Sequence, residues 1–330
     1  MSPGIKKLAA LILAGSSVPV APAAAGTEPV YPQRPVTLVL GFPPGGASDL
    51  IARHMAAYMT LELGKKVILE YKPGAAGNIA AADVARATPD GYTLYLAARP
   101  NAIHRIMYPH IDYDFQRDFT PVGMLATVPL VMITGQQSSL HDLPDVLAAA
   151  RAQPGKLVCA SGGIGTTEHL LCEVLKKAAH VDIVHAPYRG SAPALVDLMA
   201  GRIDLQITLV PGVISQIKSG AVRPIAIMGS RRIPALPDVP AIEEYLLPGK
   251  EGETWYALVA PTGTPAEVID RLNGAVNSVL QHPTLRQVMA DLAFDLPEGR
   301  NTPEDLSAFV DREVERWTAV LRERNIEPAR

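Results

Sequence analysis

The sequence is poor in cysteine and lacks the common motifs of catalytic and metal sites. Of its 330 residues only Cys159 and Cys172 are cysteines. One disulfide is therefore possible in an oxidising compartment, and two buried free thiols are the favoured interpretation. None of the eight histidines stands at a metal-ligating spacing such as His-Glu-x-x-His, and no Gly-x-Ser-x-Gly turn is present. We therefore expect no metal, no cofactor and no enzymatic activity, while a His–Asp pair assembled by folding is left open.

Long apolar segments are also missing. The apolar run 8–13 follows Lys6 and Lys7 and precedes small residues at 21–25, which is the pattern of a secretory signal peptide. The run is shorter than the roughly 20 residues that a membrane-spanning helix needs. We predict a signal peptide over residues 1–25, cleaved after Ala23 or Ala25, and a protein exported to the periplasm.

An excess of basic charge is missing too. The formal net charge is −3, and the predicted signal peptide holds two of the 30 basic residues and none of the 33 acidic ones. The mature chain would then carry a charge near −5. A mildly acidic surface argues against nucleic acid as a partner. It does not fix the charge of a small ligand, because a local site can oppose the net charge.

The chain does contain an alternation of short β-rich runs and longer helical segments. Apolar alternation predicts strands at 36–40, 67–71, 92–96, 157–160, 183–185, 203–207, 222–228 and 255–259. Helical spacing and caps predict helices at 48–59, 78–87, 167–179, 193–200, 266–280, 285–292 and 303–324, with Thr264 and Thr302 as N-cap candidates. This order favours an α/β fold with two lobes, each a mainly parallel sheet flanked by helices.

Three turns join a predicted strand to a predicted helix, at 41–49, 161–167 and 187–194. Open α/β sheets bind ligands at the carboxyl ends of their strands, where such turns lie. The N–H groups of the helix that follows form a ready anion site. The first turn lacks Gly-Lys-Ser/Thr, and the second lacks the full spacing of a dinucleotide fingerprint. A small anion is therefore a better candidate than a nucleotide.

Each turn also has a plainer interpretation. The first can be an ordinary tight turn in which Ser48 or Asp49 caps the helix. In the second, hydroxyls at Ser161 and its neighbours suit a carboxylate, but a structural turn is equally compatible. In the third, Arg189 is either a ligand clamp or a solvent-facing side chain.

The turns and the segments around them resemble one known family. The chain is similar to the substrate-binding proteins of tripartite tricarboxylate transporters, also called the Bug or TctC-like family, over essentially the whole mature sequence. The matching segments, in chain order, are 31–36, 41–49, 72–79, 89–94, 113–114, 118–122, 161–163 with Gly165, 169–170, 187–194, 197–198 with Gly201, 236–240, Trp255, 260–265, and Glu313 with 316–317.

The resemblance implies a two-lobed periplasmic-binding-protein fold of the type II, Venus-flytrap topology. Lobe 1 would comprise residues 28–128 and 254–330, and lobe 2 residues 129–253. In such a fold one small carboxylate is held at the lobe junction, chiefly by backbone N–H groups and bridging waters.

The family's binding positions can be carried over residue by residue. The expected ligand-binding set in this sequence is Phe42, Gly45, Gly46, Ala47 and Ser48 from lobe 1, and Ser161, Gly165, Thr166, Thr167, Ser191 and Thr208 from lobe 2. Asp49 belongs to the same turn, but we expect it to brace the turn, since like charges would repel an anionic ligand.

Three positions depart from the family's pattern; one, at 240–245, affects a surface turn, and the other two bear on the ligand. Arg99 stands at a predicted strand end where small residues are usual, so it either adds a charge-assisted contact to the ligand carboxylate or is solvated. Thr208 replaces a common aspartate, which removes a negative charge near the cleft and alters the expected ligand preference.

The resemblance also implies the partners. The expected role is to capture a small carboxylate in the periplasm and deliver it to the membrane subunits of a tripartite transporter, with the protein acting as a monomer. A ligand sensor that presents the same ligand to a receptor kinase is the alternative. A secreted hydrolase on this fold is less favoured, because no nucleophile–base pair is visible. The sequence does not identify the carboxylate.

Overall fold

The computed structural model describes residues 1, 31–245, 247, 252–323 and 325–326. The predicted signal peptide lies, apart from Met1, outside the described residues. Residues 31–326 are described below as one compact body.

A nine-stranded sheet runs through the described part of the chain. Its strand order is β2-β1-β3-β9-β4-β7-β5-β6, with β8 paired to β4. The strands are β1 (Val36–Leu40), β2 (Val67–Tyr71), β3 (Thr93–Ala98), β4 (Phe119–Gly135), β5 (Val158–Ser161), β6 (Val184–Pro187), β7 (Leu205–Leu209), β8 (Val222–Ile227) and β9 (Glu253–Pro261).

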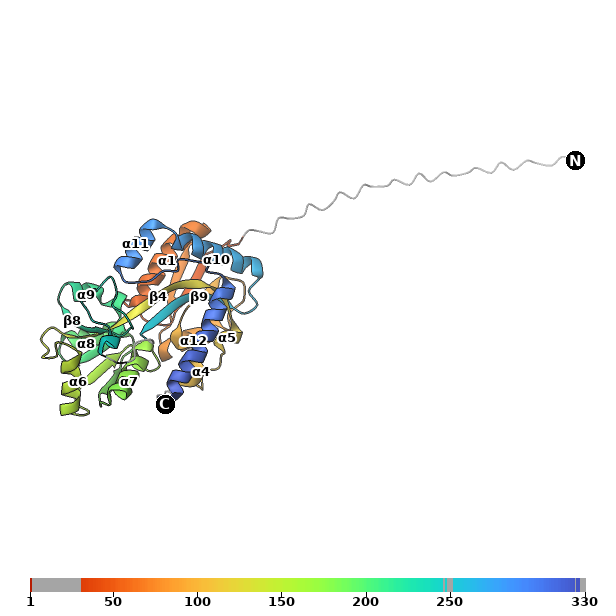
Figure 1. Cartoon of the computed structure of the whole chain (residues 1–330). Helices are drawn as coiled ribbons and strands as arrows, with labels where there is room; N and C mark the ends of the chain where they lie inside the picture. The colour runs from red at the N-terminus through yellow and green to blue at the C-terminus, as the bar shows by residue number, and fades with distance from the viewer. Residues whose placement is uncertain (2–30, 246, 248–251, 324, 327–330) are drawn as a thin grey trace. The chain divides into compact units, whose positions relative to one another are not determined.

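Two halves of this sheet share the long strand β4. The first half consists of β2, β1, β3 and β9, and the second of β7, β5, β6 and β8. From Phe119 to Pro129, β4 pairs with β9, and from Leu130 onward it pairs with β7 and β8. Figure 1 shows β4 and β9 crossing the middle of the body. The predicted lobe boundaries, at 128/129 and 253/254, fall within these two strands and stay a prediction.

Each half contains the parallel strands that the sequence predicted. β1 pairs in parallel with β2 and β3, and β5 pairs in parallel with β6 and β7. The antiparallel pairing of β4, β8 and β9 was not predicted. The sheet is therefore mixed, with a parallel set in each half whose carboxyl ends can carry a site.

Helices cover both halves of the sheet (Figure 1). They are α1 (Ala47–Leu63), α2 (Asn78–Val84), α3 (Arg99–Ala102), α4 (His104–Met107), α5 (Phe115–Asp118), α6 (Leu143–Ala152), α7 (Thr167–Ala179), α8 (Ser191–Met199), α9 (Ile214–Lys218), α10 (Ala266–Leu280), α11 (Pro283–Asp291) and α12 (Pro303–Glu323). Within the described residues, no helix has both the length and the apolar character that crossing a membrane requires.

Apolar spacing decides which face each long helix buries. In α1, Ile51, Met55 and Met59 recur every four residues and are fully buried in the core of the first half. The hydroxyl of Thr302 accepts the Asp305 N–H at 3.2 Å, so the predicted cap of α12 is confirmed. The predicted cap at Thr264 is wrong, because its hydroxyl donates to a carbonyl within the preceding turn and Pro265 is the N-cap of α10.

Candidate functional site

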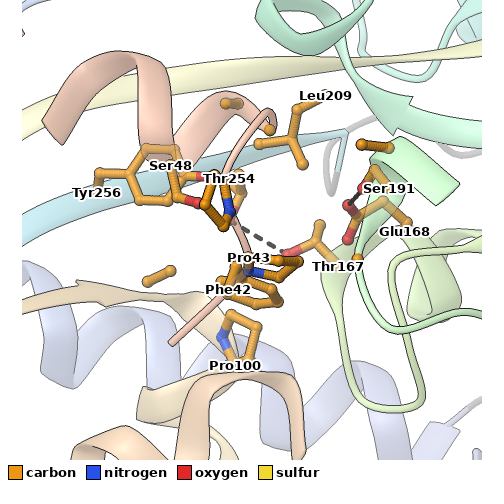
Figure 2. Close-up of a pocket in the computed structure, with 16 residues that line it drawn as sticks. Phe42, Pro43, Ser48, Pro100, Thr167, Glu168, Ser191, Leu209, Thr254 and Tyr256 are labelled. Atoms are coloured by element: carbon orange, nitrogen blue, oxygen red, sulfur yellow. Dashed lines mark hydrogen bonds between the residues drawn. The ribbon is translucent and has the colours of Figure 1, made fainter. Parts of the chain in front are cut away.

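A pocket lies where the carboxyl ends of the parallel strands of both halves meet. It encloses about 510 Å³ of space free of protein atoms, part of it open to solvent. Figure 2 shows its walls. The first half of the body contributes Phe42, Pro43, Pro44, Gly46, Ala47, Ser48, Ala98, Pro100, Thr254 and Tyr256, and the second contributes Thr167, Glu168, Gly190, Ser191, Ala192 and Leu209.

The first turn directs the N-terminus of α1 toward this pocket. Gly46 is the N-cap residue in an extended conformation, and no side chain caps the helix. The sequence-based alternative of Ser48 or Asp49 as N-cap is therefore wrong. The first N–H groups of a helix have no intrahelical acceptor. Because Ala47 and Ser48 line the pocket, this helix end offers N–H donors and a positive dipole end to an anion.

Asp49 braces the first turn from outside the pocket, as predicted. One carboxylate oxygen accepts the Gly45 N–H at 2.9 Å. The other accepts the Tyr71 hydroxyl at 2.6 Å and pairs with Arg53 at 2.8 Å. Burial alone would raise the pKa of Asp49, but these hydrogen bonds outweigh it and hold the pKa below its ordinary value. The Gly45 N–H is thereby used within the turn, and neither residue lines the pocket.

Close backbone packing holds the first turn in place. A Cβ on Gly41 would lie 2.4 Å from the Cα of Gly77, so the position requires glycine. The hydroxyl of Tyr95 donates to the Gly77 carbonyl at 2.9 Å, beside this contact. The turn before α1 is therefore held in position by the close contact between Gly41 and Gly77 and by the buried hydrogen bond from Tyr95.

The second glycine-rich turn is satisfied by its own side chains. The Gly165 N–H donates to Nδ1 of His169 at 3.1 Å, and the Thr166 hydroxyl caps α7 by accepting the His169 N–H. Oγ of Ser161 lies 2.7 Å from Nε2 of His185 and accepts a further N–H within the turn. The polar groups of Ser161, Gly165 and Thr166 are engaged inside the turn and none of the three lines the pocket, so their predicted contact with the ligand stays a prediction that this arrangement does not favour.

The two histidines of this turn pack against each other. The ring centroids of His169 and His185 are 4.3 Å apart. Burial lowers the pKa of each to about 4. Both rings are therefore neutral near pH 7, which lets Nδ1 of His169 accept the turn's N–H group.

The second half contributes polar side chains from α7 and α8. Thr167 lies beside the pocket, and its hydroxyl donates to the hydroxyl of Thr254 on β9 at 3.2 Å (Figure 2). Glu168 is buried, and its Oε1 accepts the Ser191 hydroxyl at 3.0 Å. Burial raises the pKa of Glu168, while hydrogen bonds from its own N–H, Ser191 and Thr166 oppose the rise. Thr167 and Ser191 were predicted site residues, and Glu168 was not.

The two halves touch each other around the pocket. Besides the Thr167–Thr254 hydrogen bond, the hydroxyl of Tyr108 donates to the carbonyl of Ile164 at 2.5 Å. The ring of Tyr108 lies 2.7 Å from where a Cβ on Gly165 would stand, so this position admits only glycine. The pocket is thus bounded by direct contacts between the halves.

Arg99 does not face the pocket. Its Nε donates to Oε2 of Glu313 on α12 at 3.0 Å, and its guanidinium stacks over the ring of Trp317. Only its neighbours Ala98 and Pro100 line the pocket. The strand ends at Ala98 and α3 begins at Arg99, so the turn directs the arginine into the core under α12. The interpretation of Arg99 as a solvated side chain is therefore wrong, and its predicted contact with the ligand stays a prediction that this arrangement does not favour.

Thr208 is also separated from the pocket. It is buried within β7, opposite Val131 of β4, and the next residue, Leu209, lines the pocket instead. Arg189 is exposed and is not part of the lining, so the structure favours the solvent-facing interpretation. The predicted residues that do line the pocket are Phe42, Gly46, Ala47, Ser48, Thr167 and Ser191.

Several lining residues were missed by sequence reasoning. Thr254 and Tyr256 lie on β9, and nothing in a late strand marks side chains that face a distant turn. Tyr256 is buried beside Ser48, with which it shares a hydrogen bond, and burial raises its pKa. Glu168 did carry a signal, since an acid in the first turn of a helix lies close to the helix's free N–H groups.

The lining contains no cation and no metal site. None of the lining residues, all of which belong to the described part of the chain, has a basic side chain. Across the described residues no cluster of three or more His, Cys, Asp or Glu side chains is arranged to hold a metal ion. Cys159 and Cys172 are buried free thiols outside the lining. An anionic group in this pocket would therefore be held by N–H and O–H donors.

The sequence and the fold match known proteins. Residues 51–326 match the family described as tripartite tricarboxylate transporter family receptor. A Pseudomonas sp. protein encoded in the tcbD–tcbE intergenic region is 39% identical over 292 residues, covering 88% of this chain and 86% of that protein. Protein BugT of Bordetella pertussis is 35% identical over 305 residues, covering 92% of each chain.

Solved structures with the same fold include proteins with bound acids. The periplasmic binding protein BugD superposes with a TM-score of 0.87 at 32% identity, covering 91% of this chain and all of that one. MatC from Rhodopseudomonas palustris with bound malate gives a TM-score of 0.84 at 32% identity, covering 88% of this chain and all of that one. A second R. palustris protein, with adipate, gives a TM-score of 0.86 at 34% identity, covering 91% of this chain and all of that one. The predicted periplasmic-binding-protein fold is confirmed.

Proposed function

Because the chain belongs to the family of tripartite tricarboxylate transporter receptors, we propose that it is a solute-binding protein whose ligand is a small carboxylate. The ligand would lie in the pocket between the two halves of the body. Its carboxylate would accept hydrogen bonds from the N–H groups at the start of α1, around Gly46, Ala47 and Ser48. The hydroxyls of Ser48 and Thr254 would add donors.

The uncapped N-terminus of α1 is the observation that carries this proposal. Helix N-termini are commonly capped by Ser, Thr, Asp or Asn, whose side chains accept the free N–H groups. Here Gly46 provides no such acceptor, while the two residues after it line the pocket. A ligand carboxylate would supply the missing acceptor and interact favourably with the helix dipole.

The solved relatives support the same ligand class. One has malate bound and another has adipate bound, and both share the fold over nearly the whole chain. These two acids do not fix the ligand of this chain, because ligand preference depends on the residues that line its own pocket.

We further propose that the protein works outside the cytoplasm and delivers its ligand to the membrane subunits of a tripartite transporter. The description of the family supports this partner, and the predicted signal peptide at residues 1–25 supports export. A pocket bounded by contacts between two sheet halves suits capture, since closing the halves around a ligand excludes water.

A thermal-shift screen against small organic acids tests the ligand class. A ligand present at 100 times its dissociation constant adds about 2.7 kcal/mol to the free energy of unfolding. We expect at least one mono- or dicarboxylate to raise the unfolding temperature, with a rise that grows with the logarithm of its concentration above the dissociation constant, and the corresponding amide to have no effect. If no acid in a broad panel stabilises the protein, the proposal fails.

A further inference from the structure

The pocket is lined by one acidic side chain, and the other lining residues that the structure describes offer no cation to pair with it. Glu168 lies in the first turn of α7, is buried, and its carboxylate accepts the Ser191 hydroxyl. Figure 2 shows Glu168 and Ser48 on opposite sides of the pocket. Among the lining residues, which all lie in the described part of the chain, Glu168 is the only one with an acidic side chain, and none is basic.

Glu168 also changes what the second helix end can bind. Its carboxylate accepts the N–H of its own residue, at the start of α7. The helix end that would mirror α1 is therefore already occupied by a carboxylate of the protein. The two sides of the pocket are consequently unlike, with free N–H donors at α1 and a hydrogen-bond-accepting carboxylate at α7.

A ligand with a second carboxylate would meet Glu168 with no cation between the two charges. Two like charges at contact distance in a partly dry pocket repel strongly. A protonated amine in the same place would form a charge-assisted hydrogen bond instead.

We propose that Glu168 is a specificity-determining residue, and that the pocket selects acids that carry one carboxylate and one protonated amine over dicarboxylates. This inference rests on the proposed function, in which the ligand carboxylate binds at the N-terminus of α1. The amine would then bind between Glu168 and Ser191. Burial raises the pKa of Glu168, and an ammonium group beside it would favour the ionised carboxylate.

Matched pairs of ligands test the inference, with binding measured by isothermal titration calorimetry. The pairs are 3-aminopropanoate with succinate, 4-aminobutyrate with glutarate, and 5-aminopentanoate with adipate, added to a panel of α-amino acids and hydroxy acids. In each pair an ammonium group replaces a carboxylate at similar chain length. We expect the protein to prefer the amino acid in the pair that fits best.

The variant Glu168→Gln removes the charge while keeping the shape of the side chain. Loss of a charge-assisted hydrogen bond should weaken binding of the amino acid by about 10- to 100-fold. The same variant should bind the matching dicarboxylate more tightly than the unsubstituted protein does. Glu173→Gln is the control, because Glu173 lies on the same helix and pairs with Lys176 outside the pocket. It should leave both affinities unchanged.

The possible outcomes separate this inference from the function beneath it. If the protein prefers dicarboxylates and Glu168→Gln leaves that preference unchanged, the inference is overturned while carboxylate binding stands. If no acid binds to the protein or to either variant, both proposals fail. Circular dichroism and thermal unfolding of each variant establish that it is folded.

Discussion

Replacing Gly46 by aspartate should make the protein more stable and weaken ligand binding strongly. Gly46 already has the extended backbone of an N-cap residue, with φ −97° and ψ −179°. A Cβ built on Gly46 meets no atom within 4 Å. The new carboxylate can therefore fold back onto the free N–H groups of α1 without strain. It would occupy the place proposed for the carboxylate of the ligand.

The two expected effects have opposite signs and different sizes. An aspartate N-cap stabilises a helix by about a few tenths of a kcal/mol more than a glycine N-cap does, and its negative charge adds about 0.3–1 kcal/mol of stability at the helix N-terminus. The free energy of unfolding should therefore rise by about 0.5–1 kcal/mol. The ligand would lose at least two charge-assisted hydrogen bonds of about 1.5 kcal/mol each, so its dissociation constant should rise by about 100-fold or more.

Urea unfolding and calorimetry with the best acid from the screen measure the two effects. Gly46→Ala adds a side chain without an acceptor and should bind within a few-fold of the unsubstituted protein. Gly274→Asp is the matched control, since Gly274 lies on the exposed side of α10 and its Cβ would also meet no atom within 4 Å. A Gly46→Asp variant that binds with undiminished affinity would refute the reasoning that the α1 N-terminus holds the ligand.

Three further predictions concern the framework of the site. Glu313→Met should lower the free energy of unfolding, measured with urea, by about 3–5 kcal/mol, because it leaves the buried cation of Arg99 unpaired. Arg99→Met should lower it by less and leave ligand affinity unchanged. Equal losses of stability in the two variants would contradict this asymmetry. The folded-state pKa of His169 and His185, about 4 against an ordinary 6.5, should make the free energy of unfolding fall by about 2–4 kcal/mol as the pH drops from 6.5 to 4. The double variant His169→Gln/His185→Gln should flatten that pH dependence. Gly41→Ala should lower the free energy of unfolding by about 1–3 kcal/mol through overpacking, and it should weaken ligand binding. Urea unfolding and calorimetry measure the two effects. A variant with unchanged stability would contradict the close contact between Gly41 and Gly77.

The two substitutions in the Arg99–Glu313 ion pair should differ in their effect on stability, because different partners remain after each one. Without Arg99, the Glu313 carboxylate keeps Nε1 of Trp255 at 3.1 Å and the Arg316 guanidinium at 2.5 Å. Without Glu313, the guanidinium of Arg99 loses its Nε hydrogen bond and keeps its stacking on the indole ring of Trp317, and its Nη1 has no hydrogen-bond partner among the described residues. Burial lowers the pKa of Arg99 to about 10 while Glu313 opposes that shift, and because a guanidinium keeps its proton in proteins, loss of Glu313 leaves a buried cation.

Periodicity and turn chemistry predicted much of the fold. The bounds of α7 and α10 match the prediction, because both helices combine a clear apolar stripe with a sharp start. The 17-residue strand β4 was not predicted. It contains Pro121 and Pro129, and two irregularities in its pairing with β9 interrupt the alternation that marks a strand.

The site was predicted in position more accurately than in detail. The turns after β1, β5 and β6 do meet at one pocket, because the two parallel sets run in opposite directions and both end beside the middle of β4. Which side chain points inward depends on the path of the backbone after each strand. At the end of β3 that path selects Ala98 and Pro100 over the charged residue between them. In the second turn, the hydroxyl of Thr166 is hydrogen-bonded within the turn, and the next residues, Thr167 and Glu168, form the pocket wall.

The shared strand β4 makes the two halves of the body inseparable. On its way from the first half to the second, the chain follows β4, which is hydrogen-bonded first to β9 and then to β7 and β8 as one continuous ribbon. Any rotation of one half against the other must then be taken up as twist spread along that ribbon, which limits the directions of motion. Cutting the chain to isolate one half would leave an unpaired strand edge in each fragment, and exposed edges of that kind promote aggregation.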